Sequence, residues 1–364
     1  MKNSELFTIL CDCLAFSDEN DRLSSTLSMT DFPWEGFIES ASQHLVTPAL
    51  HNTLKEKGVL ESIPRDVADY LEATLILNRT RNEELQCDLL KIGEQFNIHG
   101  ITPVALKGAA SLVEELYPDN GMRVLSDLDI VIPKQRLDEC VKILHGLGFQ
   151  TQTDFEDEFT GICHHYYPLV KKDGITVVEL HLEVVHDGYQ EMLPLQLLEE
   201  NCQVIDWQGA RIATLSPTLR VLHNILHTHL ADSNFRFKQV SLRQLYELGM
   251  IVRKESTAID WDWILSQFET NDSLPALENY LLLGSSLLNM DLPGNINTRI
   301  TQTKARDRLL WQIDHPGVSG IRRTLSHVGE NLLNALRTPA KLKRLLNPQW
   351  FAYKLKKLGS FWTK

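Results

Sequence analysis

The sequence predicts an α+β fold, in which a small mixed sheet is flanked by helical regions on its N- and C-terminal sides. Two observations lead to this prediction. Apolar residues recur at helical spacing over residues 1–98 and again beyond residue 215. Between these regions, short apolar strand-like runs alternate with helical segments, which is typical of a compact mixed α/β unit. At 364 residues, the chain is long enough for two or three packed units.

The first elements follow the local signals in order. The N-terminal helical region ends at Asn97–Gly100, a helix-stop signature. The next signals predict a short strand over 101–106, a helix over 107–117 and a turn at 118–121. This segment therefore leads from the helical region into the sheet.

The remaining elements complete the sheet and return to helices. A strand is expected over 126–132, then a helix from Pro133 to the glycines at 146 and 148, then two strands, 164–170 and 175–185, joined by a hairpin turn. Ser216-Pro217 begins the next helix. We therefore divide the chain into a helical N-terminal region (1–98), an α/β core (99–214), a helical C-terminal domain (215–335) and a basic, aromatic tail (336–364).

Composition indicates an ordinary soluble globular protein, with 43% apolar and 23% charged residues. No run of about 18 uncharged apolar residues is present, so no transmembrane helix is expected. The first residues lack the pattern of a secretory signal. The six cysteines are scattered and form no CxxC pair, which favours reduced thiols. We therefore expect a cytoplasmic protein.

The net charge of −12 is unevenly distributed. Residues 321–364 carry ten lysines and arginines and a single acid, Glu330, so this segment is +9 and the rest of the chain is −21. An acidic body argues against generic nucleic-acid binding. The basic, aromatic tail is expected to dock on that body. Peripheral contact with the inner face of a membrane is the first alternative, and nucleic acid is the second.

The most informative stretch is Ser126–Ile132, in which Asp127 and Asp129 precede an apolar, β-branched run. In an extended strand, alternate side chains share a face, so the two carboxylates point the same way, about 7 Å apart. Such a pair beside a hydrophobic core requires a compensating cation, and a divalent metal with oxygen ligands is the usual one.

A third carboxylate lies on the second strand of the predicted hairpin, where Glu179, His181 and Glu183 share a face. Antiparallel or mixed pairing with the aspartate strand would bring Glu179 beside the aspartates. Three carboxylates around one point can hold two Mg²⁺ ions about 3.5–4 Å apart, as needed for in-line attack at phosphorus. His181 is expected to orient Glu179 or contact substrate, and the alternative is a hydrogen-bonded core histidine.

A phosphate-binding element is also predicted, because Lys107-Gly108 begins a helix. Free backbone N–H groups and the positive end of the helix dipole favour phosphate there, and Gly108 allows close approach.

Five segments together resemble the DNA polymerase β-like nucleotidyltransferase superfamily, and in particular its branch of uncharacterised bacterial nucleotidyltransferases. These segments are Leu106–Ala110, Leu116–Pro118, Arg123, Asp127–Val131 and Val178–His181, and the resemblance covers roughly residues 70–270. It implies a nucleotidyltransferase fold, Mg²⁺ and a nucleoside triphosphate (NTP) donor. Asp127 and Asp129 match the paired metal ligands, and Glu179 matches the third carboxylate.

The chain departs from the superfamily at the helix start, where Gly108 is followed by Ala109 rather than serine. The hydroxyl that would contact a phosphate is therefore missing, and Lys107 or Arg123 is expected to supply that contact.

The resulting hypothesis is an Mg²⁺-dependent nucleotidyltransferase that acts on an unknown acceptor hydroxyl and releases pyrophosphate. The alternative is a catalytically inactive protein of the same fold that binds nucleotide or a partner. One form of this alternative places the protein at a membrane surface.

A helical histidine pair, His223 and His227, has the i, i+4 spacing of zinc ligands but lacks an intervening HExxH glutamate. Helix packing or the lining of a substrate pocket is therefore the favoured interpretation.

Overall fold

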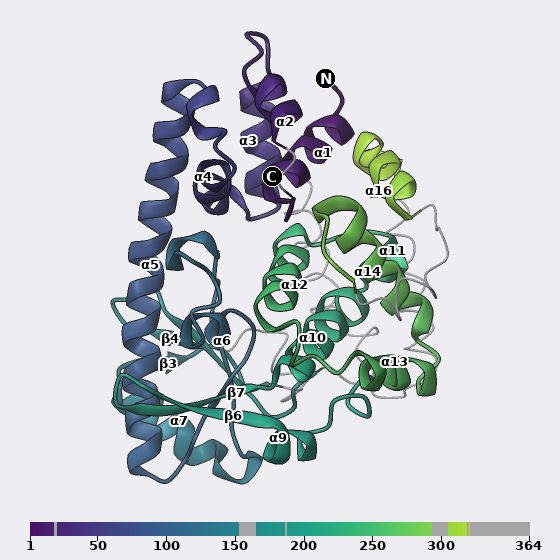
Figure 1. The fold of residues 1–364 in the computed structure, drawn as a ribbon. Coiled ribbons are helices and arrows are strands. Elements are labelled where there is room, and N and C mark those ends of the chain that lie inside the picture. Colours follow the sequence, from purple (N-terminus) through teal and green to yellow (C-terminus); the bar gives the residue numbers. More distant parts are fainter. Residues whose placement is uncertain (18–19, 153–164, 186–187, 293–304, 319, 321–364) are drawn as a thin grey trace, which may run out of the picture.

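A computed structural model describes the chain except residues 18–19, 153–164, 186–187, 293–304, 319 and 321–364 (Figure 1). The predicted tail, 336–364, lies outside the described residues. The architecture is α+β, as predicted: one mixed sheet with helices packed around it.

The sheet contains seven strands in the order β3-β4-β5-β2-β1-β7-β6 among the described residues. The strands are β1 (Val104–Ala105), β2 (Leu128–Val131), β3 (Phe149–Thr151), β4 (Leu169–Lys171), β5 (Val177–His181), β6 (Cys202–Trp207) and β7 (Ala210–Leu215). β2 runs parallel to β5 and antiparallel to β1, and β1 runs parallel to β7. The hairpin between β4 and β5 is antiparallel, as its turn predicted.

Three of these strands, β3, β6 and β7, were not predicted. β6 is mostly exposed and lies at the edge of the sheet, so it lacks the apolar alternation of a half-buried strand. Its turn into β7 uses Gln208 and Gly209, both with positive φ (52° and 100°), which is the two-residue geometry of a tight hairpin.

The N-terminal region is helical as predicted, with α1 (Asn3–Leu14), α2 (Asp21–Leu27), α3 (Trp34–Gln43), α4 (Thr47–Glu56), the 3₁₀ turn η1 (Leu60–Ser62) and α5 (Arg65–Ile98). The long α5 runs down one side of the molecule (Figure 1). Its first half packs Leu71 and Leu75 into the core of the helical layer, and its second half packs Leu89 and Ile92 into the core beside the sheet. One helix therefore spans both hydrophobic cores.

Two features fix α5 on the sheet. Gly93 allows close approach to β7, because a Cβ there would lie 3.1 Å from side-chain atoms of Ala210 and Ile212. Nearby, the buried Asp88 accepts hydrogen bonds from Lys171 (2.9 Å) and Thr176 (2.7 Å) in the β4–β5 hairpin. These contacts hold the hairpin, and with it β5, against the helix.

The elements between the strands are shorter than predicted. α6 (Lys107–Val113) ends after two turns rather than at residue 117, and the 3₁₀ turn η2 (Asn120–Met122) follows it. After β2, the 3₁₀ turn η3 (Lys134–Arg136) precedes α7 (Leu137–Gly146), so the α-helix begins later than Pro133.

The C-terminal elements are α9 (Gln196–Asn201), α10 (Pro217–Ile225), the π-helical turn η4 (Leu226–Ala231), α11 (Asn234–Phe237), α12 (Leu242–Glu255), α13 (Trp261–Thr270), α14 (Leu274–Leu288) and α16 (Ala305–Asp314). α1 packs against α14 and α16, and Asp314 accepts hydrogen bonds from the backbone N–H and hydroxyl of Ser4. The N- and C-terminal helices thus share one core. Among the described helices, none combines the length and hydropathy needed to cross a membrane.

Candidate active site

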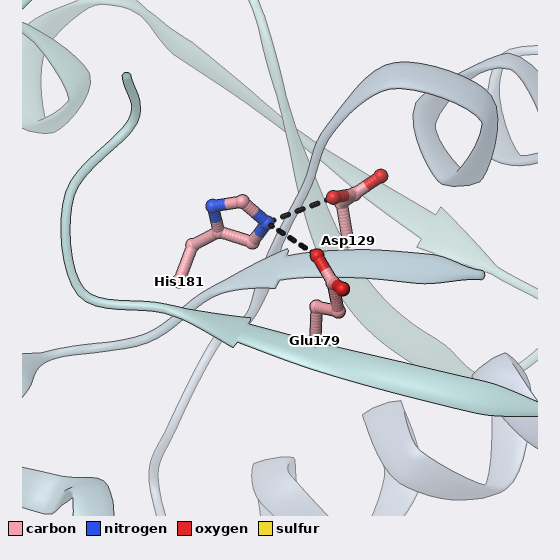
Figure 2. A group of neighbouring side chains, drawn as sticks. All are labelled: Asp129, Glu179 and His181. Carbon is pink, nitrogen blue, oxygen red and sulfur yellow. Dashed lines mark hydrogen bonds and ion pairs between the residues drawn. The ribbon is translucent and has the colours of Figure 1, made fainter. Parts of the chain in front are cut away.

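The candidate site forms where β2 and β5 lie side by side as parallel neighbours. In this register, Asp129 is opposite Glu179 and Val131 is opposite His181. The sequence predicted antiparallel or mixed pairing of these strands; the pairing is parallel, within a sheet that is mixed as a whole. Because alternate residues of a strand share a face, Glu179 and His181 project on the same side as Asp129. Figure 2 shows the three side chains converging from the two strands.

The geometry of this triad is compact. His181 Nε2 lies 2.8 Å from Asp129 Oδ1 and 3.8 Å from Glu179 Oε2. One ligand atom from each residue lies within 4.8 Å of the others, which is close enough for all three to contact a single ion. Carboxylate oxygens suit Mg²⁺, and an imidazole nitrogen also suits first-row transition metals. The donor set therefore fits a divalent cation.

Asp127 occupies a different position from Asp129. β2 begins at Leu128, so Asp127 lies just before the strand, half-buried, and its carboxylate accepts a hydrogen bond from the Ser126 hydroxyl at 2.8 Å. The predicted strand over 126–132 was therefore too long at this end. Among the described residues, the compact triad contains Asp129 but not Asp127, which stands at its rim.

Lys107 provides the cationic side of the site. Its Nζ lies 2.7 Å from Asp129 Oδ1, the same oxygen that contacts His181 Nε2. Lys107, the first residue of α6, has a backbone φ of 48°. This value lies in the left-handed region, which residues other than glycine, asparagine and aspartate seldom adopt. The start of α6 thus directs this ammonium group to the carboxylate at the centre of the triad.

The pKa values of the two carboxylates of the triad are shifted in opposite directions. Burial would raise the pKa of Asp129, which is 2% exposed, but Lys107 and His181 outweigh it and hold that pKa well below its ordinary value. Burial raises the pKa of Glu179, and the charges of Asp129 and Asp127 add to the rise, while His165 opposes it. Asp129 is therefore held in its ionised form, whereas Glu179 is the carboxylate that more readily takes a proton.

Gly108 and Ala109 are both buried at the start of α6. A Cβ at Gly108 would lie 2.8 Å from Cγ of Leu125, so glycine is required here for packing against the segment before β2. Ala109 is fully buried in the core beside the sheet, at the position where the superfamily commonly has serine. α6 is thus packed tightly under the site.

Arg123 is buried and its contacts are structural. Its Nε donates to Glu247 at 2.5 Å, Nη1 to the Val124 carbonyl at 2.5 Å and Nη2 to Gln244 at 3.4 Å. Burial would lower the pKa of Arg123, but Glu247 outweighs it and raises that pKa. A phosphate contact by Arg123, as the sequence predicted, requires one of these bonds to be exchanged.

The segment that carries Arg123 is fixed from a second side by α5. The Asn78 amide donates to the carbonyls of Gly121 (2.7 Å) and Arg123 (3.0 Å), and the Asn82 amide donates to the same Arg123 carbonyl at 2.8 Å. The path of the chain into β2 is therefore determined by buried hydrogen bonds to residues about 40 positions earlier.

Sequence reasoning missed Glu247 and Arg243, both on α12. The available signal was a charged residue within an otherwise apolar helical face, since Leu245, Tyr246 and Leu248 are also buried. The partner of Glu247 could not be inferred, because Arg123 lies 124 residues earlier.

A small cavity with both polar and apolar lining lies between α6 and the C-terminal helices. Its volume is about 20 Å³, which is room for roughly one water molecule, and its lining includes Lys107, His223, His227 and Glu247. Burial, with help from the Lys107 charge, lowers the pKa of His223 to about 3, so this imidazole is neutral. Both histidines line this cavity, in agreement with the helix packing or pocket lining that the sequence favoured, and a role in binding substrate stays a prediction.

Lys107→Met is expected to raise the affinity of the nucleotide-free protein for Mg²⁺ or Mn²⁺ by about tenfold. The reason is that the ammonium group competes with a metal ion for Asp129 Oδ1, and removing a cation at this distance strengthens the local negative field. Calorimetric titration with each metal measures the change. Lys172→Met, which removes an exposed lysine from the β4–β5 hairpin, is the matched control. Unchanged or weaker binding in Lys107→Met would contradict this competition.

Comparisons with known proteins place this site in a family. No curated protein matches the sequence. Among solved structures, an antigenic nucleotidyltransferase-like protein from Paracoccidioides brasiliensis is similar at 18% identity, covering 58% of this chain and 94% of its own, with a TM-score of 0.37. The antibiotic-resistance factor ANT(2'')-Ia is similar at 12% identity, covering 55% of this chain and 98% of its own, with a TM-score of 0.36. A second structure of that factor, in complex with adenylyl-2''-tobramycin, covers 52% of this chain and 98% of its own, with a TM-score of 0.35.

These structural similarities are too low to carry an argument about the activity of this chain. The sequence itself, however, matches the family described as "Uncharacterised nucleotidyltransferase" over residues 30–289, which is well over half of the chain. The resemblance predicted from the short motifs is confirmed. The chain therefore belongs to this family of uncharacterised nucleotidyltransferases.

Proposed function

We propose that this protein transfers a nucleotidyl group from an NTP to an acceptor hydroxyl and releases pyrophosphate. The observation that carries the proposal is the triad of Asp129, Glu179 and His181 beside the largely buried Lys107, in a member of a nucleotidyltransferase family. The donor set fits Mg²⁺, and we assign Asp129, Glu179 and the nearby Asp127 as ligands for two ions. When bound, such ions stabilise phosphate charge and lower the pKa of an attacking hydroxyl.

The bond changes of the transfer are simple. The acceptor oxygen forms a bond to the α-phosphorus of the NTP. The bond from that phosphorus to the bridging oxygen of the β-phosphate breaks, and pyrophosphate leaves with the electron pair. The proton of the acceptor hydroxyl moves to the carboxylate of Glu179, which lies opposite Asp129 in the register of β2 and β5.

The other residues of the site position and balance charge. His181 Nε2 holds Asp129, and Lys107, once exchanged from Asp129, is placed to contact a phosphate oxygen of the donor. We assign Gly108 and Arg123 to the packing and path of the segments that carry the site, because their space and hydrogen bonds are already taken by Leu125 and Glu247. The protein thus acts chiefly by positioning and electrostatics.

The test is transfer of label from each of the four α-³²P-labelled NTPs, with Mg²⁺ and a cell extract as the source of acceptor. The wild-type protein is expected to label a component of the extract, and the Asp127→Ala/Asp129→Ala protein is expected not to. Mg²⁺-dependent NTP binding without transfer to any component would instead support the inactive alternative, which the buried Ala109 keeps open. Absence of both transfer and binding would rule out the proposed function.

A further inference from the structure

A second arginine, Arg243 of α12, lies beside the segment that enters the site. Its Nη1 donates to the Val124 carbonyl at 2.8 Å, and Arg123 Nη1 donates to the same oxygen at 2.5 Å. Two guanidinium groups thus share one carbonyl. Val124 is only three residues before Asp127, and the charge of Asp127 acts on Arg243. The arginine is therefore close to the rim of the metal-binding triad.

The positive charge of Arg243 is not balanced by an ion pair within the described part of the chain, although the charges of Glu247, Asp127 and Asp232 act on it. The neighbouring carboxylate, Glu247, is already paired with Arg123, and no carboxylate oxygen of a described residue lies within 4.0 Å of Arg243. Its Nε is buried and has no hydrogen-bond partner there. Burial lowers the pKa of Arg243 to about 10, and repulsion from Arg123 adds to the effect. The side chain is half-buried, and partial burial of a cation without an ion pair is unfavourable.

The geometry of the Arg243 guanidinium indicates which kind of anion would bind to it. With Nη1 bound to the backbone, the Nε–Nη2 edge makes no hydrogen bond among the described residues. That edge is the planar fork by which arginine binds phosphate or carboxylate through two parallel hydrogen bonds. A carboxylate ligand would be repelled by the neighbouring acidic triad, whereas a phosphate chelated to Mg²⁺ would bring its own counter-charge.

We propose that Arg243 binds a phosphate group of the donor NTP. This inference rests on the proposed function. It assigns the phosphate contact missing at Ala109 to the C-terminal helices, because Arg243 lies on α12, more than 130 residues after Ala109. Arg123 then serves to hold α12 in place through Glu247.

The experiment measures binding of Mg²⁺-pyrophosphate, which carries no base, and of the four α,β-methylene NTPs, by calorimetry on the full-length protein. Arg243→Met is expected to weaken binding at least tenfold. Arg243→Lys, which keeps the charge and loses the fork, is expected to weaken it at least threefold. The matched control is Arg253→Met, which removes an exposed arginine from the same helix and is expected to change nothing.

Melting temperature without ligand separates a binding role from a structural one. Removal of an unbalanced cation is expected to leave the melting temperature of Arg243→Met unchanged or higher, while the stabilisation by ligand is lost. A lower melting temperature with unchanged ligand affinity would overturn the inference. If Arg243→Met does not fold, the test uses Arg243→Lys. A ligand affinity of Arg243→Lys equal to that of the wild type would then overturn the inference. Failure of the wild type to bind any probe would instead remove the proposed function itself.

Discussion

Asp129→Asn is expected to lower nucleotidyl transfer by about 10³-fold or more, because metal ions contribute several kcal/mol of charge stabilisation at a phosphoryl transition state. Asp129 is the central residue of the site: it is 2% exposed, and one of its oxygens contacts both Lys107 and His181. The asparagine keeps its size while removing its charge. Transfer of label at saturating Mg²⁺ measures the loss, and calorimetric titration should show weakened metal binding in parallel.

Stability must be separated from chemistry in this variant, since neutralising Asp129 leaves the Lys107 ammonium group without its partner in a largely buried position. The double variant Lys107→Met/Asp129→Asn removes that unpaired charge. It is expected to recover the wild-type melting temperature while remaining inactive. Retention of more than a tenth of wild-type transfer by Asp129→Asn would show that Asp129 is not a required ligand.

Glu247→Gln is expected to lower the free energy of unfolding by about 3–5 kcal/mol, the usual cost of removing one partner from a buried ion pair. Arg123 and Glu247 have side chains that are 5% and 4% exposed, so the remaining guanidinium cannot be solvated by water in the folded protein. Urea unfolding of the full-length protein measures the change.

A surface pair of equal length provides the control. Arg136 Nε and Glu139 Oε2 are also 2.5 Å apart, but these side chains are 36% and 38% exposed. Glu139→Gln is therefore expected to leave the free energy of unfolding almost unchanged, because water screens and replaces the lost contact. The double variant Arg123→Met/Glu247→Met should recover most of the loss. Equal effects of Glu247→Gln and Glu139→Gln would show that burial does not govern the strength of the pair.

Local pattern was sufficient to predict much of the fold. Helical periodicity identified the N-terminal helices and the helix beginning at Pro217, and the turn at 171–174 identified the β4–β5 hairpin. The edge strand β6 escaped prediction because an exposed strand carries no apolar alternation. Element ends were also less certain than element types: β2 begins at Leu128, so Asp127 falls outside the strand.

The chemical types in the candidate site were visible in the sequence, because Asp129 and the Glu179–His181 pair stand out within apolar strands. Pairing of the Glu179 strand with the aspartate strand was also predicted, but its parallel direction was not, because the order and direction of the strands are decided by packing over the whole domain. The place of Lys107 at Asp129 likewise depends on how α6 packs beneath Leu125.

The sequence by itself therefore determined the fold class, the nucleotidyltransferase family and the carboxylates proposed to bind metal, since each depends on short-range pattern or a local motif. Only the tertiary structure decided that Asp129, rather than Asp127, is the centre of the triad, that Arg123 is paired with Glu247, and that Arg243 faces the same segment. Those contacts join residues more than 50 or even 120 positions apart, and burial, not sequence spacing, sets their strength.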